Sequence, residues 1–146
     1  MQNLTKQHIT TLLKPREANS HKGTYGHALL IAGNKYKMGA ALIAAKACLR
    51  SGAGLLTVNI PSEERFILQT AIPEAMLFAR EDTKYDVNNF SAIGIGPGIG
   101  TEEDAKKLLK QTLTDCNQPL LLDADALNIL AADKSLLSLL KSNTIL

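Results

Sequence analysis

Three stretches of this sequence combine glycines, small residues and carboxylates in a way that suits a phosphate-bearing small molecule. They are residues 33–40, 94–101 and 123–128. In the middle stretch, Gly98 and Gly100 can take positive φ, and the proline between Gly96 and Gly98 stiffens the turn. Because these residues lack side chains, a ligand's phosphate can approach backbone N–H groups near the start of a helix at Thr101. A tight strand-to-helix turn without a ligand fits the same pattern.

Two common nucleotide-binding motifs are absent from the sequence. A P-loop beginning at Gly33 would need its second glycine where Met38 stands, and no Lys-Ser/Thr pair follows Gly39. The dinucleotide fingerprint G-x-G-x-x-G, started at Gly94 or Gly96, would place its third glycine on Ile99 or Thr101. The sequence therefore indicates neither a Walker-type ATPase nor a standard Rossmann dehydrogenase.

Further candidates for ligand contact lie outside the central glycine stretch. Gly33 ends an apolar run, and Gly39-Ala40 at the start of a small-residue helix permits close approach, although packing explains that pair equally well. Lys22 precedes the first strand and can meet a phosphate, although solvated loop lysines are the commoner case.

Two carboxylates, Asp123 and Asp125, stand at another strand end, with Asn128 one turn further along. Two interpretations of Asp125 stay open. It can cap the following helix, or it can meet Mg²⁺ or a ribose hydroxyl.

The elements that must position these residues alternate regularly along the chain. Strands are expected at residues 27–32, 55–60, 75–79, 90–95 and 119–122. Helices are expected at residues 5–14, 38–50, from 61 onward, 101–115, 125–130 and 133–141, and another apolar run starts at 143. This alternation predicts an α/β fold with right-handed βαβ units and a mainly parallel sheet. Ligands of such sheets bind outside the carboxyl ends of the strands, where all three candidate stretches begin.

Two local patterns in the helices carry more detailed expectations. The small residues at positions 40, 44, 47 and 48 form one side of the 38–50 helix, which predicts that this side lies flat against the sheet. Thr101-Glu-Glu-Asp104 resembles a capping box, with Asp in place of the commoner Glu.

Composition excludes several classes of protein. The chain of 146 residues has a net charge of +2 and an aromatic content of 4 %, which argues against binding of nucleic acid. No apolar stretch reaches signal-peptide length at the N-terminus or membrane-helix length elsewhere, so we expect a cytoplasmic protein that does not bind membranes. Cys48 and Cys116 lie far apart without paired histidines, which indicates free buried thiols and not a zinc site.

Taken in order, these strings resemble one family. The matching segments are His21-Lys-Gly23, Tyr25-Gly26 through Ala32-Gly33, Met38-Gly-Ala40, Leu49-Arg-Ser-Gly-Ala-Gly54, Pro73-Glu74, Gly96-Pro-Gly-Ile-Gly100 and Asp123-Ala-Asp-Ala-Leu-Asn128. Together they resemble the ADP- or ATP-dependent NAD(P)H-hydrate dehydratases, over residues 20–146. The resemblance implies a ribokinase-like α/β fold, in which helices flank a mainly parallel sheet on both faces, truncated in this chain.

The resemblance also implies a function and a set of site residues. Hydrated NADH or NADPH is returned to the working cofactor, after ATP or ADP, with Mg²⁺, converts the ring hydroxyl into a leaving group. The substrate-binding residues implied are Ala40, Gly98, Gly100, Asp125 and Asn128. Candidates for phosphate or nucleotide contact are Lys22, Gly33, Gly39 and Gly96. The resemblance identifies no metal ligands.

Several expectations concern the extent of the protein. Residues 1–146 match the N-terminal portion of a single dehydratase domain, without an epimerase domain, and the catalytic residues are expected beyond residue 146. We therefore expect a homo-oligomer, a swapped dimer or a second chain that carries the remainder. Two alternatives stay open: a ribokinase-like kinase of a small hydroxyl compound, and a non-catalytic nucleotide-binding fragment.

Overall fold

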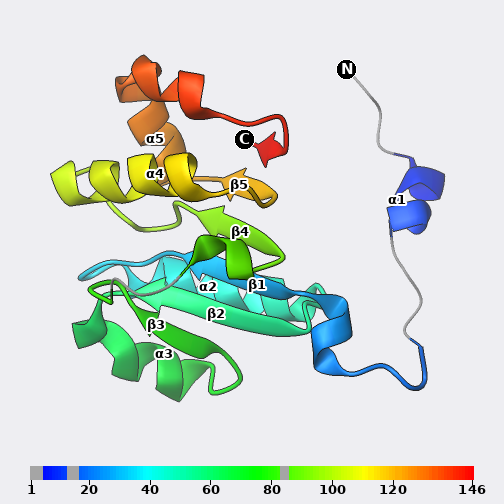
Figure 1. Ribbon diagram of the computed structural model, residues 1–146. Coiled ribbons are helices and arrows are strands. Elements are labelled where there is room, and N and C mark those ends of the chain that lie inside the picture. The colour runs from blue at the N-terminus through cyan, green and yellow to red at the C-terminus, as the bar shows by residue number, and fades with distance from the viewer. Residues whose placement is uncertain (1–4, 13–16, 83–85) are drawn as a thin grey trace.

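The computed structural model describes residues 5–12, 17–82 and 86–146 and is built on one six-stranded parallel sheet (Figure 1). Its strands are β1 (His27–Ile31), β2 (Leu55–Ile60), β3 (Met76–Ala79), β4 (Ala92–Ile95), β5 (Leu120–Leu122) and β6 (Thr144–Ile145). Their order across the sheet is β3-β2-β1-β4-β5-β6, and every neighbouring pair is parallel. The predicted α/β class, the parallel sheet and the edge position of the 75–79 strand are confirmed.

Helices cover the sheet on both faces, as the resemblance implies. The α-helices are α1 (Lys6–Leu12), α2 (Met38–Arg50), α3 (Arg65–Ala71), α4 (Glu103–Asp115) and α5 (Asp125–Ala132). The 3₁₀ helices are η1 (Lys22–Tyr25), η2 (Ser62–Glu64), η3 (Val87–Asn89) and η4 (Lys134–Leu139). In Figure 1, α1 lies apart from the sheet. In the chain it precedes η1 and β1.

Two apolar cores lie on opposite faces of the sheet, because side chains alternate along each strand. In β1, Leu29 and Ile31 pack with α4, α5 and η4, whereas Leu30 and the following Ala32 pack with α2 and α3. Both faces of β1 are therefore covered, which explains its uninterrupted apolar sequence.

Two local expectations are wrong. Residues 133–141 form the 3₁₀ helix η4 and not an α-helix, because Asp133 accepts hydrogen bonds from the backbone and the hydroxyl of Ser135 at its start. No capping box forms at residues 101–104, since α4 begins at Glu103 and its N-cap, Glu102, makes no capping hydrogen bond. The expected 5–14 helix is confirmed as α1 over Lys6–Leu12, and residues 13 and 14 lie outside the described part of the chain.

The side of α2 that packs on the sheet also differs from the prediction. Met38, Ala41 and Ala45 are the buried residues of α2. The small-residue side instead borders an apolar groove of about 530 Å³, which α2 contributes to through Ala44, Ala47, Cys48 and Ser51. The groove crosses β1, β4 and β5 and reaches Pro97 and Asp123 at the carboxyl edge, where Leu121 on its floor is 49 % exposed.

Among the described residues, no helix is both long enough and apolar enough to cross a membrane.

Candidate functional site

The candidate residues meet where the strand order of the sheet reverses. β2 and β3 lie on one side of β1, and β4, β5 and β6 lie on the other. In open α/β sheets, the crevice at such a reversal, outside the carboxyl ends of the strands, is the usual place for a ligand. Here the loop that follows β1 and the loop that follows β4 flank this crevice.

The two loops are hydrogen-bonded to each other. The backbone N–H of Gly33 donates to the carbonyl oxygen of Pro97 at 2.8 Å, and the side-chain amide of Asn34 donates to the carbonyl of Ile99 at 3.2 Å. Gly33 has a φ of 70°, which favours glycine at this position. These two hydrogen bonds join the loop after β1 to the loop after β4. We call the place where the two loops meet the junction.

The glycine stretch 96–100 packs tightly against its neighbours. Gly96, Gly98 and Gly100 have φ values of 134°, 68° and 87°. A Cβ on Gly98 would lie 2.9 Å from Cβ of Ala40 and 2.9 Å from the carbonyl oxygen of Lys37. A Cβ on Gly96 would overlap the carbonyl oxygen of Asp123. Packing therefore requires glycine at these positions whether or not a ligand is bound.

The backbone N–H groups of this stretch are mostly occupied within the protein. Gly96 donates to Ile31, Ile99 donates to Gly96, and Gly100 donates to the Oδ2 atom of Asp125 at 2.8 Å. The amide of Thr101 donates to Glu102 Oε2 at 2.9 Å. A phosphate that bound the last two amides would have to displace a carboxylate, so the loop is not a ready-made phosphate cradle.

Asp125 does not cap the helix that it begins. The N-cap of α5 is Ala124, which has a φ of 49°, and Asp125 is the first residue of the helix. Its Oδ2 accepts the Gly100 amide, and its Oδ1 accepts the side-chain amide of Asn128 at 3.3 Å. The capping interpretation is wrong, because the carboxylate is turned toward the loop after β4.

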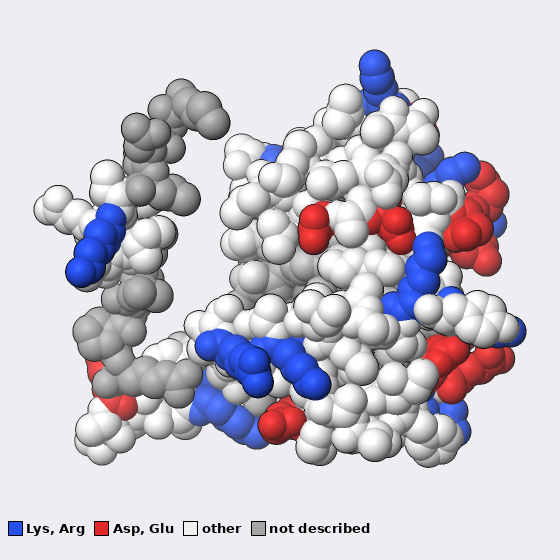
Figure 2. Space-filling model, turned by 180° about the vertical axis from the view of Figure 1, so that it is seen from behind, with Lys and Arg blue, Asp and Glu red and all other residues white. Residues whose placement is uncertain are grey.

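A lysine that sequence reasoning missed completes this junction. Lys37 precedes α2, and its Nζ lies 3.6 Å from Oδ2 of Asp125. Figure 2 shows acidic and basic side chains side by side on the back of the molecule. The only signal in the sequence was a lysine next to a helix start, which is too common to single out.

The structure brings most of the predicted site residues to this edge, but not Lys22. At the junction, Gly98 packs against Ala40, and Gly100 is hydrogen-bonded to Asp125. Asn128 joins them through its hydrogen bond to Asp125. Gly39, at the start of α2, has no atom within 4 Å of where its Cβ would be, so the space beside it is open.

Lys22 lies at the other end of the sheet. It belongs to η1, ahead of β1, and its carbonyl packs against Gly54, just ahead of β2. Since β1 and β2 are parallel, this is the amino edge of the sheet. The structure therefore separates Lys22 from the other candidates.

An arginine that sequence reasoning also missed holds the strand ends in place. Arg80, directly after β3, donates from Nη2 to the carbonyl of Ala32 at 2.9 Å and to that of Asn59 at 3.2 Å. Its Nε donates to Oδ1 of Asn59 at 3.3 Å. Asn59 is fully buried, and its Nδ2 has no hydrogen-bond partner among the described residues. Because Ala32 precedes Gly33, Arg80 anchors the strand end from which the first loop leaves.

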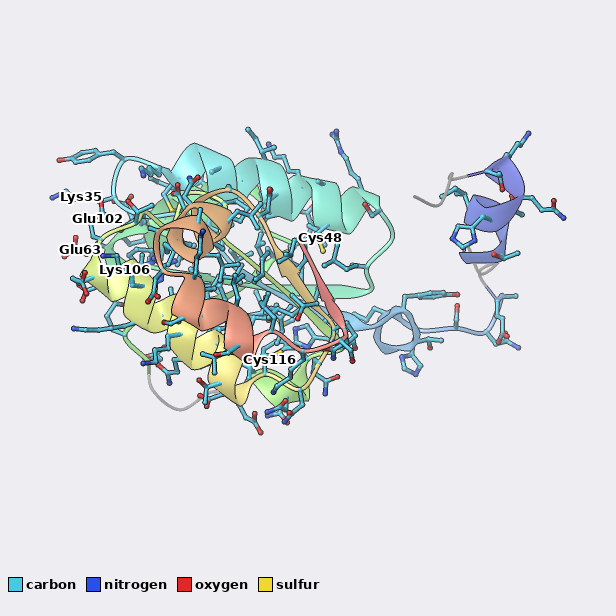
Figure 3. The ribbon with its side chains drawn as sticks, turned by 90° about the horizontal axis from the view of Figure 1, so that it is seen from above. Lys35, Cys48, Glu63, Glu102, Lys106 and Cys116 are labelled. Atoms are coloured by element: carbon cyan, nitrogen blue, oxygen red, sulfur yellow. The ribbon has the colours of Figure 1, made fainter. Side chains whose placement is uncertain are left out.

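Several charged side chains lie toward the carboxyl edge of the sheet, whereas the two cysteines lie away from it. Seen from above, Lys35, Glu63, Glu102 and Lys106 lie toward one side, whereas Cys48 and Cys116 lie toward the other (Figure 3). Both cysteines are free, and burial raises the pKa of each thiol. Cys116 is buried as expected, but Cys48 is only half-buried at the groove.

The described residues offer no ready-made metal centre. No group of three or more His, Cys, Asp or Glu side chains is arranged to hold a metal ion among residues 5–12, 17–82 and 86–146. Asp125, which the sequence offered as a possible Mg²⁺ ligand, contacts a backbone amide and an ammonium.

Comparison with known proteins gives one consistent match. A sequence model of the family described as NAD(P)H-hydrate dehydratase matches residues 28–146. An ADP-dependent (S)-NAD(P)H-hydrate dehydratase of Listeria monocytogenes is 38 % identical over 136 residues, which cover 90 % of this chain and 49 % of the relative.

Solved structures agree with this match. A ribokinase-like superfamily protein of Enterococcus faecalis superposes with a TM-score of 0.82 at 32 % identity, covering 90 % of this chain and 48 % of that one. An ADP/ATP-dependent NAD(P)H-hydrate dehydratase of Bacillus subtilis, co-crystallized with ATP/Mg²⁺, gives a TM-score of 0.74 at 36 % identity. The match covers 84 % of this chain and 46 % of the Bacillus subtilis protein. The chain thus spans about half the length of these relatives.

Proposed function

The chain belongs to the NAD(P)H-hydrate dehydratase family, and from this premise we propose that its carboxyl-edge junction binds hydrated NADH or NADPH for nucleotide-dependent dehydration. The observation that carries the proposal is the meeting of Ala40, Gly98, Gly100 and Asp125 at the reversal of the strand order.

The chemistry of the junction suits a hydroxyl-rich ligand better than a bare phosphate. Asp125 is a carboxylate with a side-chain exposure of 19 %, and its oxygens retain lone pairs beyond those used by Gly100 and Asn128. A ribose or ring hydroxyl can donate to these lone pairs. Ala40 and Gly39 leave room for the ligand beside the start of α2, where a larger side chain would not.

The proposed reaction removes water from the hydrated nicotinamide ring with the help of ADP or ATP. The ring hydroxyl oxygen attacks the terminal phosphorus of ATP or ADP, the P–O bond to the bridging oxygen breaks, ADP or AMP leaves, and the hydroxyl proton passes to solvent. The C–O bond then breaks, and phosphate leaves with its bonding pair. A proton lost from the ring system then restores the double bond. This chain's residues bind and orient the dinucleotide in this scheme, and we assign no proton transfer to any of them.

The phosphoryl donor and its ion belong to the same proposal. Mg²⁺ would neutralise charge on the donor's phosphates, as in other phosphoryl transfers. The described residues do not form its site, so no step is assigned to the ion. We place the reaction in the cytoplasm, which the two free cysteines support.

The test is a titration followed by a turnover assay on the chain. We expect NADPH to bind in isothermal titration calorimetry. When a second chain carrying the part of a relative that this chain does not span is added, we also expect hydrated NADH, supplied with Mg²⁺ and either ADP or ATP, to be converted to NADH, seen as a rise in absorbance of the reduced nicotinamide. Binding without turnover would limit the function of this chain to dinucleotide binding. Absence of both would contradict the proposal.

A further inference from the structure

The carboxylate of Asp125 lies partly buried between three loops, with 19 % of its side chain exposed. Its Oδ2 accepts the Gly100 amide at 2.8 Å, and its Oδ1 accepts Asn128 at 3.3 Å. Both donors are neutral amides. Removing a carboxylate from water is unfavourable unless a positive charge or several hydrogen bonds compensate it. A cation beside Asp125 would add to these two hydrogen bonds.

Lys37 is that cation, and it reaches Asp125 across the crevice. Its Nζ lies 3.6 Å from the same Oδ2 that accepts the Gly100 amide, and its side chain is 50 % exposed. The backbone carbonyl of Lys37 also lies against the glycine stretch, 2.9 Å from the position of a Cβ on Gly98. Lys37 thus touches the glycine stretch with its backbone and Asp125 with its ammonium.

We propose that Lys37 is a positioning residue: its ammonium holds the Asp125 carboxylate in the orientation that binds the Gly100 amide, and so sets the glycine stretch for its ligand. This inference rests on the proposed function, because that function supplies the ligand. An ion pair half open to water adds little to folding stability. Its effect is on orientation, because free rotation of the Asp125 side chain would release the Gly100 amide.

Lys35 provides a matched control in the same loop. It carries the same charge two positions earlier, and its Nζ lies 5.4 Å from the centre of the Tyr36 ring. No ion pair joins Lys35 to an acid among the described residues. Replacing Lys35 therefore changes net charge equally without removing the contact to Asp125.

The decisive experiment measures the Gly100 amide in the ligand-free chain. Hydrogen exchange by NMR is compared for the wild type, Lys37→Met, Lys37→Arg and Lys35→Met, with melting temperature as the check on folding. We expect Gly100 to exchange about two- to fivefold faster in Lys37→Met, from the free energy of such pairs. Lys37→Arg should restore the wild-type rate, and Lys35→Met should leave it unchanged.

Two additions separate positioning from a general structural effect. In an Asp125→Asn background, Lys37→Met should cause no further acceleration, because the partner charge is already absent. The dissociation constant for NADPH should also rise in Lys37→Met, at an unchanged melting temperature, because a smaller fraction of the chain holds the glycine stretch in its binding orientation.

A wild-type exchange rate of Gly100 in Lys37→Met, or an equal acceleration in Lys35→Met, would overturn the inference. Failure of the wild type to bind NADPH would instead contradict the proposed function. The ligand-free exchange rates would still decide whether Lys37 positions Asp125.

Discussion

The carboxylate of Asp125 accepts a hydrogen bond of 2.8 Å from the backbone amide of Gly100, which lies 25 positions earlier in the chain. The bond joins the first residue of α5 to the glycine stretch after β4. It replaces the local cap that an acid at a helix start usually makes. Because the carboxylate also contacts Lys37, it is the point at which the loops after β1, β4 and β5 meet.

Replacing the charge of Asp125 should weaken ligand binding more than folding. Asp125→Asn keeps an oxygen that can accept the Gly100 amide, so we expect little change in melting temperature. A hydrogen bond from a ligand hydroxyl to a carboxylate is stronger than one to an amide, so the NADPH dissociation constant should rise about tenfold. Calorimetry measures the affinity and a thermal melt the stability.

The matched control for this change is Asp123→Asn. Asp123 is exposed, and its side chain makes no hydrogen bond to a described residue. We expect normal affinity and stability. Equal loss of affinity in the two variants would mean that net charge, not the Asp125 contact, is responsible.

A side chain at Gly98 should disrupt both the junction and the binding. Gly98 has a φ of 68°, which costs a non-glycine residue about 1–2 kcal/mol. Its Cβ would also press on Ala40 and Lys37. We expect Gly98→Val to lower the denaturant midpoint and to abolish NADPH binding in calorimetry.

Gly94→Ala serves as the comparison for this prediction. Gly94 lies in β4, its φ is not positive, and the nearest atom to its Cβ would be Cδ1 of Leu30 at an ordinary 3.5 Å. This variant should fold and bind normally. If Gly98→Val also bound NADPH normally, the glycine stretch would be a turn without a role in binding.

Arg80 should contribute to stability through the strand ends that it holds. Arg80→Met leaves the carbonyl of Ala32 and the side chain of Asn59 without their donors, at an expected cost of about 1–3 kcal/mol in the free energy of unfolding. Arg65→Met is the control, because Arg65 is exposed and, among the described residues, its side chain contacts only near neighbours, donating to Ser62 and lying over the ring of Phe66. Urea unfolding compares the two. A loss in Arg65→Met as large as in Arg80→Met would contradict this role.

His27 predicts how stability depends on pH. Burial lowers the pKa of His27 from its ordinary value of 6.5, and its Nε2 is hydrogen-bonded to the hydroxyl of Thr57 at 2.8 Å. The unfolded chain therefore binds the proton of this histidine more tightly than the folded chain does. The contribution of neutral His27 to the free energy of unfolding is full above pH 6.5 and is lost as pH falls toward the folded-state pKa.

Urea unfolding over this range should show a smaller pH dependence in His27→Gln than in the wild type. The same replacement at the exposed His21 should leave the dependence in place. An identical pH profile in His27→Gln and the wild type would contradict the assignment.

Sequence reasoning could reach the fold and much of the candidate site, because both follow from local signals. The apolar runs of 27–32 and 55–60 and the positive-φ glycines at 98 and 100 are properties of short segments. The parallel sheet then places their loops at one edge. The placement of Ala40 beside Gly98 follows from that topology.

The contacts that sequence reasoning missed join residues far apart in the chain. Lys37 pairs with Asp125, and Arg80 donates to the carbonyl of Ala32. The residues next to each of them in the sequence do not indicate these contacts. The packing side of α2 was assigned wrongly for a related reason. Alanines lie on both sides of α2, so residue size does not distinguish the side with Met38, Ala41 and Ala45, which meets this sheet, from the side at positions 40, 44, 47 and 48.

The binding of the dinucleotide at the carboxyl edge is tested most directly by titrating the ¹⁵N-labelled chain with NADPH and following its backbone amide signals. We predict saturable shifts confined to residues 33–40, 96–101 and 123–128, with Gly100 among the largest. The amino edge, including Lys22 and Gly54, should stay unperturbed. The absence of saturable shifts, or shifts centred on Lys22 and Gly54, would contradict the account.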